Sequence, residues 1–191
     1  MITAIVLAAG ESRRFGEQKL VVPFMGKPIV RHAVERALGS GAGETIVVTG
    51  ANAADVRGAL AGLAVRFVDN PEYRKGMSTS LAAGILALAP GTEAAIIALG
   101  DQPLVPAAAY AGVLAEFAKD RPAIIAASYH GVRGHPVLFA AEAFAELIAE
   151  RGDRGARAVI GKDPRRVRYV ELSLPVPADV DDPEALAALN P

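Results

Sequence analysis

The chain has 191 residues, of which 52% are hydrophobic and 21% are charged, and its formal net charge is −1. A chain of this length and composition can bury a substantial core, which excludes an intrinsically disordered protein. The near-zero charge argues against a protein that coats nucleic acid or an anionic membrane, so neither is expected as a partner. We expect one domain that spans residues 1–191.

The sequence contains no cysteine. This excludes disulfides and thiolate metal sites and agrees with a reducing compartment. The apolar run at the N-terminus is short, has no basic segment before it and is broken at Gly10, so it does not resemble a signal peptide. No stretch approaches the ~20 consecutive apolar residues of a membrane span. We therefore expect a cytoplasmic protein.

Continuously apolar runs alternate along the whole chain with segments in which apolar residues recur at helical spacing. The run from Ile2 to Leu7 is continuously apolar, which is typical of a buried parallel strand. Pro28 suits the first turn of a helix, apolar residues then recur at helical spacing to Leu38, and Gly39 ends the pattern. The same criteria predict strands at residues 44–49, 65–68, 94–99, 123–127, 136–139 and 167–171, and helices at residues 53–61, 78–88, 106–118, 140–150, 155–161 and from residue 183.

This alternation predicts an α/β fold with a doubly wound, mostly parallel sheet in three layers, α/β/α. Right-handed crossovers bring the carboxyl ends of such strands to one edge of the sheet, where ligands bind. The loops that follow Leu7, Val68 and Leu99 all leave that edge. Functional residues are therefore expected in these loops.

The sequence LAAGESRRFG at residues 7–16, with Lys19 behind it, follows the first strand. Its small residues leave the backbone open to a planar ring or a phosphate, and Arg13, Arg14 and Lys19 add positive charge. It matches neither G-x-x-x-x-G-K-[ST] nor G-x-G-x-x-G, the commoner phosphate loops. The combination is suited to binding a nucleoside triphosphate. The alternative is an ordinary strand-to-helix turn with solvated arginines.

Two acidic sequences are candidate magnesium ligands. Asp101 lies just past the strand at residues 94–99, and Asp179 and Asp181 flank Val180 near the C-terminus. Alternation along an extended backbone would point both members of the pair to the same side. Mg²⁺ needs only one or two protein carboxylates when phosphates and waters supply the rest. The alternatives are a turn-forming aspartate at Asp101 and a helix start at the pair.

Arg133, His135 and Arg157 form a third group of candidates. The sequence R-G-H-P at residues 133–136 is expected in a loop between strands, and both arginines could bind the phosphate of an acceptor molecule through a bidentate fork. Such a phosphate is already ionised near neutral pH, so its attack needs no strong base. We therefore expect His135 to be structural or to contact the substrate rather than to carry a proton.

Six short motifs follow one another along nearly the whole chain. They are L-A-A-G-x-S-x-R-x-G with Lys19, Asn70 with G-M-S-T-S at residues 76–80, L-G-D-Q-P at 99–103, G-x-R-G-H-P at 131–136, G-D-x-G-A-R at 152–157 and D-V-D at 179–181. In this order they resemble the MobA-like family of nucleotidyltransferases, and within it the molybdenum cofactor cytidylyltransferases of the MocA type. The resemblance implies a Rossmann-like, glycosyltransferase-A-like fold.

The resemblance further implies a Mg²⁺-dependent enzyme. Its reaction would transfer CMP from CTP to the terminal phosphate of molybdenum-molybdopterin, giving molybdopterin cytosine dinucleotide and pyrophosphate. The implied nucleotide-binding residues are Leu7, Ala8, Ala9, Gly10, Ser12, Arg14, Lys19, Asn70, Gly76 and Ser80. The implied catalytic residues are Lys19, Arg14 and Asp101, the metal ligands are Asp101, Asp181 and Asp179, and the acceptor-binding residues are Arg133, His135 and Arg157. For Asn70, a turn ahead of Pro71 is an equally good interpretation.

Ala9 is the main indication for CTP rather than GTP, because the cytidylyl-type signature reads L-A-A-G where the guanylyl type reads L-A-G-G. The alternatives are guanylyl transfer to molybdopterin and nucleotidyl transfer to another phosphorylated acceptor. A third is a non-catalytic carrier that passes the molybdenum cofactor to a recipient molybdoenzyme. The presence of Lys19, Asp101 and Asp181 together argues against a carrier, which has no need of a metal site.

Overall fold

The computed structural model describes residues 1–12, 15–16 and 18–189. A seven-stranded sheet runs through its centre in the order β5-β4-β1-β6-β8-β7-β9. The strands are β1 (Ile2–Ala8), β4 (Glu44–Thr49), β5 (Arg66–Asp69), β6 (Ala94–Leu99), β7 (Ile124–Tyr129), β8 (Val132–Ala140) and β9 (Val167–Leu172). In this sheet β8 runs antiparallel to both of its neighbours and the other pairs are parallel. The expectation of a mostly parallel sheet is confirmed.

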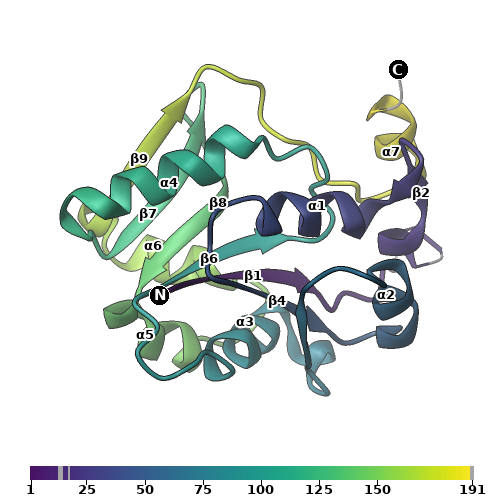
Figure 1. The fold of residues 1–191 in the computed structure, drawn as a ribbon, viewed down its shortest axis with the longest axis horizontal. Helices are drawn as coiled ribbons and strands as arrows, with labels where there is room; N and C mark the ends of the chain where they lie inside the picture. Colours follow the sequence, from purple (N-terminus) through teal and green to yellow (C-terminus); the bar gives the residue numbers. More distant parts are fainter. Residues whose placement is uncertain (13–14, 17, 190–191) are drawn as a thin grey trace.

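Helices cover both faces of the sheet (Figure 1). One face carries α1 (Ile29–Leu38), α2 (Ala53–Ala59) and α4 (Ala107–Asp120), and the other carries α3 (Met77–Leu86), α5 (Phe144–Ala149) and α6 (Ala156–Lys162). Short 3₁₀ turns lie at Lys19–Val21, Tyr73–Lys75, Ala141–Ala143 and Pro164–Arg166. The last helix, α7 (Pro183–Leu189), packs beside a hairpin of β2 (Pro23–Phe24) and β3 (Lys27–Pro28). The arrangement confirms three layers, α/β/α.

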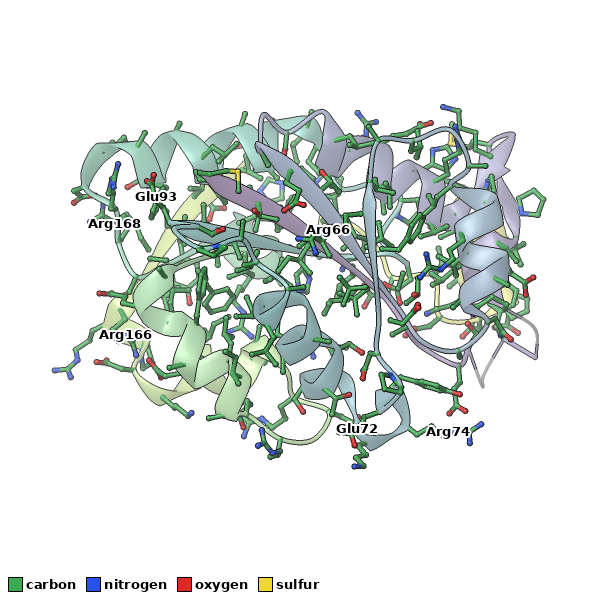
Figure 2. All side chains as sticks on the ribbon, turned by 60° about the horizontal axis from the view of Figure 1, so that its bottom comes forward. Arg66, Glu72, Arg74, Glu93, Arg166 and Arg168 are labelled. Carbon is green, nitrogen blue, oxygen red and sulfur yellow. The ribbon has the colours of Figure 1, made fainter. Side chains whose placement is uncertain are left out.

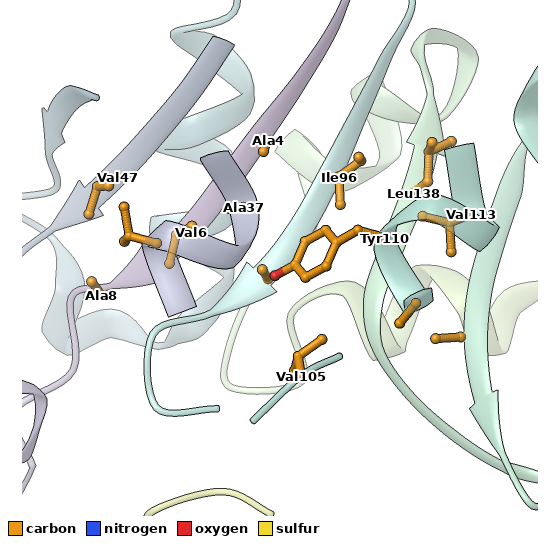
Figure 3. Close-up of a cluster of buried hydrophobic side chains, with 14 of the residues drawn as sticks. Ala4, Val6, Ala8, Ala37, Val47, Ile96, Val105, Tyr110, Val113 and Leu138 are labelled. Atoms are coloured by element: carbon orange, nitrogen blue, oxygen red, sulfur yellow. The ribbon is translucent and has the colours of Figure 1, made fainter. Parts of the chain in front are cut away.

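The strands are continuously apolar because helices cover both of their faces. Val6, Val47 and Ile96, on three neighbouring strands, have no exposed surface. On the side of α1 and α4 they belong to one buried cluster with Tyr110 and Val113 (Figure 3). Burial of this kind contributes about 25 cal/mol per Å² of apolar surface. The sheet is therefore a stable frame for the loops at its edge.

The order of the strands reverses between β1 and β6. After β1 the chain builds outward through β4 and β5, and it then returns to the other side of β1 as β6. The carboxyl ends of β1 and β6 are joined there, because the Gly100 amide donates to the Leu7 carbonyl at 2.9 Å. Open α/β sheets bind ligands at such a reversal. The two loops with the strongest sequence motifs both begin at this point.

Strand β8 corrects the expectation of a short strand preceded by a loop. It begins at Val132, and Arg133 pairs with Ser128 of β7. The pairing then skips two residues of β8, His135 and Pro136, which form a β-bulge. The polar half of the strand lies at its exposed start and resembles a loop in the sequence, whereas the apolar half is buried. Bulges of this kind are common beside active sites, where they redirect side chains.

Two smaller differences concern short elements. The helix expected at residues 140–150 consists of a 3₁₀ turn followed by α5. The β2–β3 hairpin is absent from the predicted elements, because strands of two residues show no periodic pattern.

Arg166 and Arg168 lie at one end of the fold (Figure 2). Arg166 pairs with Glu146 at 2.7 Å, and Arg168 pairs with Asp120 at 2.6 Å. Such solvent-facing pairs contribute little to stability. Among the residues that the structure describes, no helix combines the length and the apolar character needed to cross a membrane.

Candidate active site

Lys19, Asp101 and Asp181 come from distant parts of the chain and meet at the carboxyl edge of the sheet. The Lys19 Nζ donates to Asp101 Oδ2 at 2.7 Å and to Asp181 Oδ1 at 3.1 Å. The Lys19 side chain is only 12% exposed. Three side chains that the motifs indicate as catalytic residues or metal ligands therefore lie at one site.

The two carboxylates keep Lys19 charged. Burial disfavours the ammonium, but the adjacent carboxylates of Asp101 and Asp181 outweigh it, and the pKa of Lys19 lies above its ordinary value. Lys19 is therefore a cation throughout the neutral pH range. Its single positive charge offsets one of the two negative charges of Asp101 and Asp181.

Val180 fixes the acidic segment 179–181. Its amide donates to the Asp101 carbonyl at 3.0 Å. Its side chain is fully buried in an apolar cluster with Phe15, Phe24 and Ile29. Because Val180 is turned into this cluster, both flanking aspartates reach polar cavities. They reach different ones, Asp181 the first and Asp179 the second, so the expectation that alternation points both to the same site is wrong.

The first cavity has a volume of about 410 Å³ and includes the Lys19 site. It is lined by most of the residues predicted to bind the nucleotide, namely Leu7, Ala8, Ala9, Gly10, Ser12, Lys19, Gly76 and Ser80. The small side chains after β1 leave room for a ligand to approach the backbone. Arg14, which is predicted to bind the nucleotide and to act in catalysis, lies outside the described residues.

Asn70 is not in the wall of this cavity, and its side chain is used within the protein. Its amide nitrogen donates to Thr79 Oγ1 at 2.8 Å and to Ser80 Oγ at 2.9 Å. Its side-chain oxygen accepts a hydrogen bond from the Glu72 amide at 2.9 Å. Asn70 therefore forms the turn ahead of Pro71 and holds Ser80 in the cavity wall. The geometry favours the turn interpretation over a direct contact with the nucleotide.

Gly76 occupies the point where α3 meets the loop at residues 151–155. Its φ of +113° is a conformation that side chains rarely adopt, and a Cβ atom would lie 2.6 Å from the carbonyl carbon of Gly152. The Ser78 amide donates to the Gly152 carbonyl at 3.1 Å, so the loop is bonded to the first turn of the helix. Conformation and space both require glycine at this position.

Replacing Gly76 by alanine is expected to lower the free energy of unfolding by roughly 1–3 kcal/mol, because of the strained backbone and the clash. It should also weaken nucleotide binding, because the displaced loop forms part of the cavity wall. Denaturant unfolding and titration calorimetry measure the two effects. Gly58→Ala is the matched control, since nothing lies within 4 Å of a Cβ atom there. Equal stability of the two variants would contradict the expectation.

The second cavity has a volume of about 280 Å³. It is lined by Gln102, which follows Asp101, and by Asp179, which lies two residues before Asp181. The Gln102 side-chain amide donates to Asp179 Oδ1 at 2.5 Å. Burial raises the pKa of Asp179, although the Gln102 bond opposes this. The three residues predicted to bind the acceptor, Arg133, His135 and Arg157, all line this cavity.

His135 is a neutral side chain at physiological pH. Burial, together with the positive charges of Arg157 and Arg133, lowers the pKa of His135 to about 4. A neutral imidazole can both donate and accept a hydrogen bond. It therefore adds no charge beside the two guanidinium groups. This state agrees with a structural or substrate-contacting His135.

Several residues in the wall of the first cavity are absent from the predicted set: Glu11, Leu20, Tyr73, Arg74, Met77, Leu99 and Asp153. Arg74 lies on the turn before α3 (Figure 2) and pairs with Glu11 at 3.0 Å. Asp153 belongs to the G-D-x-G-A-R motif, and that motif is the signal in the sequence that could have indicated it. The others depend on how the loops pack.

The carboxylates of Asp101 and Asp181 fit a divalent cation. Their oxygen atoms are close enough to share one ammonium group, and carboxylate oxygens are preferred ligands of Mg²⁺ and Mn²⁺. Within the described part of the chain, no group of three or more His, Cys, Asp or Glu side chains is arranged to hold a metal ion. A cation at this site would therefore need further oxygen ligands from a nucleotide or water.

The strand order, the reversal at β1 and the cavity beside it define a Rossmann-like nucleotide-binding fold. Residues 4–167 match the MobA-like NTP transferase domain. The chain therefore belongs to the MobA-like NTP transferase family, as its motifs indicate.

The relatives of this chain have different names. Nicotine blue oxidoreductase of Paenarthrobacter nicotinovorans is 31% identical over 183 residues, which are 90% of this chain and 87% of that protein. Molybdenum cofactor cytidylyltransferase of Escherichia coli K12 is 27% identical over 138 residues, 72% of this chain and 69% of that protein. The bifunctional protein GlmU of Agrobacterium fabrum is 37% identical over 109 residues, 55% of this chain, but the match spans only 24% of its length.

Solved structures show the same fold over nearly the whole chain. Rv0371c from Mycobacterium tuberculosis has a TM-score of 0.89 at 28% identity, with coverage of 98% of this chain and 96% of that chain. A complex of Rv0371c with manganese has a TM-score of 0.84 at 26% identity, covering 98% and 97%. A nucleotidyl transferase from Methanothermobacter has a TM-score of 0.85 at 26% identity, covering 100% and 96%. Family and fold thus support a nucleotidyltransferase.

Proposed function

We propose that this protein transfers CMP from CTP to the terminal phosphate of molybdenum-molybdopterin, forming molybdopterin cytosine dinucleotide and releasing pyrophosphate. The observation that carries the proposal is the position of Lys19, which bridges Asp101 and Asp181 in the wall of the first cavity. The relative named molybdenum cofactor cytidylyltransferase supports this choice of donor and acceptor.

In this proposal the first cavity binds CTP, with the triphosphate at Lys19. The acceptor phosphate attacks the α-phosphorus in line, a new P–O bond forms, and the bond to pyrophosphate breaks. No covalent bond to the protein is needed, so positioning and electrostatics provide the acceleration. Lys19 stabilises the negative charge on the α-phosphate and the departing pyrophosphate, and Arg14 assists it according to its place in the motif.

Asp101 and Asp181 would hold a divalent cation, which we propose is Mg²⁺. When bound, this cation would neutralise part of the negative charge of the triphosphate. The same two carboxylates accept hydrogen bonds from Lys19. The lysine side chain must therefore turn from the carboxylates to the phosphates as the nucleotide arrives. Asp179, the third candidate ligand in the sequence, lines the second cavity, and we therefore assign it to the acceptor rather than to the metal.

The second cavity would bind the acceptor. Arg133 and Arg157 supply two guanidinium groups for its phosphate. Val137 and Ile160 offer apolar surface to a ring system, and Asp179 can accept hydrogen bonds from ring N–H groups. The cavity thus combines the groups that a phosphorylated heterocycle requires.

A redox reaction is the second candidate function. It is favoured by the relative named nicotine blue oxidoreductase, which shares more of its sequence with this chain than the cytidylyltransferase does. The Lys19 site favours the transferase, because a cation between two metal-binding carboxylates serves phosphate chemistry rather than electron transfer. Ala9 remains the basis for CTP over GTP.

The test is pyrophosphate release with CTP, GTP, ATP or UTP and Mg²⁺, with and without molybdenum-molybdopterin. Release that requires both CTP and this acceptor is the expected result. Release with GTP would indicate the guanylyl reaction, and release only with another phosphorylated compound would change the acceptor. No release with any pair would contradict a transferase and favour a cofactor carrier. Conversion of nicotine blue by this protein would instead support the redox function.

A further inference from the structure

Asp153 places a carboxylate in the wall of the first cavity, on the loop between α5 and α6. Its Oδ1 would lie 2.8 Å from a Cβ atom at Gly76, so it is close to the start of α3. The hydrogen bond from the Ser78 amide to the Gly152 carbonyl holds the loop there. The backbone of a loop from the C-terminal part of the chain is therefore held beside a cavity built mainly by the N-terminal part, and the exposed Asp153 side chain lines that cavity.

Charge pairing distinguishes Asp153 from the other acidic residues of this cavity. Asp101 and Asp181 share Lys19, and Glu11 pairs with Arg74. Within the part of the chain that the structure describes, the Asp153 carboxylate has no hydrogen bond or ion pair. An unpaired carboxylate repels phosphate groups and can act only as a hydrogen-bond acceptor. It is suited to a part of the ligand that donates hydrogen bonds.

A nucleoside triphosphate carries such donors only in its nucleoside part, at the ribose hydroxyls and the N–H groups of the base. The proposed function places the phosphates at Lys19. Among the described residues, the ion pairs of Lys19 are with Asp101 and Asp181 and not with Asp153. The Asp153 carboxylate lies instead beside Gly76, at the start of α3, so we assign it to the nucleoside end of the cavity rather than to the phosphate end.

We propose that Asp153 accepts a hydrogen bond from the nucleoside, at the ribose 2′-hydroxyl or at the exocyclic amine of cytosine, and thereby helps to select the nucleotide. This inference rests on the proposed function, because it takes CTP as the ligand of the first cavity. If the cytosine amine donates to Asp153, the site would select CTP over UTP, because O4 of uracil is an acceptor and cannot donate to a carboxylate. A partner 2′-hydroxyl would select ribonucleotides over deoxyribonucleotides.

The test is titration calorimetry of the full chain with CTP, UTP and 2′-deoxy-CTP in the presence of Mg²⁺. Asp153→Ala is expected to bind CTP about 10- to 100-fold more weakly than the wild type, the effect of a lost hydrogen bond to a charged group. It should also lose the preference for CTP over one of the other two nucleotides. Loss of the preference over 2′-deoxy-CTP identifies the hydroxyl, and loss of the preference over UTP identifies the amine.

Glu11→Ala is the matched control, because it removes a different carboxylate from the same cavity. It is expected to change the affinity for all three nucleotides by the same factor. Asp153→Asn, which keeps an acceptor oxygen, should retain part of the preference. If Asp153→Ala keeps both preferences, or binds CTP as tightly as the wild type, the inference is wrong. If the wild type binds CTP poorly, the proposed function itself is contradicted.

Discussion

Lys19→Met is expected to lower kcat for pyrophosphate release by about 10²- to 10³-fold, the usual effect of removing a group that stabilises transition-state charge. The same change should tighten the binding of Mn²⁺ or Mg²⁺ to the nucleotide-free protein. The reason is that Lys19 offsets one of the two negative charges of Asp101 and Asp181 and occupies the space between them. Without the ammonium, two adjacent carboxylates face each other, and a divalent cation relieves their repulsion.

The two effects have separate measurements. Steady-state pyrophosphate release gives kcat, and calorimetric titration with Mn²⁺ in the absence of nucleotide gives the metal affinity. The variant should also gain more thermal stability from Mn²⁺ than the wild type, because a ligand that binds only the folded state stabilises it. Lys27→Met is the control, since Lys27 pairs with Glu35 on the surface. Unchanged kcat together with unchanged metal affinity would show that Lys19 has a structural role only.

Asp101→Asn is expected to lower kcat at a fixed Mg²⁺ concentration by about 10²-fold or more, because an amide is a weaker metal ligand than a carboxylate. The Mg²⁺ concentration that gives half-maximal activity should rise. Asp181→Asn should act in the same direction but less strongly, because Asp181 is more exposed, 35% against 23%, and lies further from Lys19 Nζ. Activity at saturating CTP, measured over a range of Mg²⁺ concentrations, tests whether Asp101→Asn has the larger effect. Mn²⁺ binding is measured separately.

Asp179→Asn provides the comparison that separates the two cavities. Asp179 lines the second cavity and is bonded to Gln102. Its replacement should leave the Mg²⁺ requirement unchanged and raise the KM for the acceptor. A raised Mg²⁺ requirement in this variant would place Asp179 among the metal ligands instead. The three aspartate variants together thus decide which carboxylates hold the metal.

The sequence predicts the sheet well because its strands are buried on both faces. β1 and β6 are continuously apolar, and each is followed directly by small and charged residues at the carboxyl edge. Because the carboxyl ends of parallel strands lie at one edge of the sheet, the sequence predicts that Lys19 and Asp101 lie close together. Asp181 follows no strand directly. In the sequence, only the D-V-D motif indicates that Asp181 belongs to the site. The structure supplies the physical reason, which is the burial of Val180.

Other features depend on contacts that no local pattern contains. The Asn70 side chain donates hydrogen bonds to Thr79 and Ser80. Only the packing of α3 against the end of β5 brings these groups together. The start of β8 is polar and exposed, so its strand character comes from pairing with β7 rather than from its own residues. Asp153 reaches the first cavity through a loop whose contact with Gly76 is tertiary.

The two cavities are built from different stretches of the chain. Apart from Asp153 and Asp181, the first is lined by residues between Leu7 and Asp101, and the second by residues between Gln102 and Asp179. Changes in β8 or α6 can therefore alter what the second cavity accepts without disturbing the first. During evolution, members of the family could therefore keep the first cavity unchanged while substitutions in the second cavity adapt it to a new substrate.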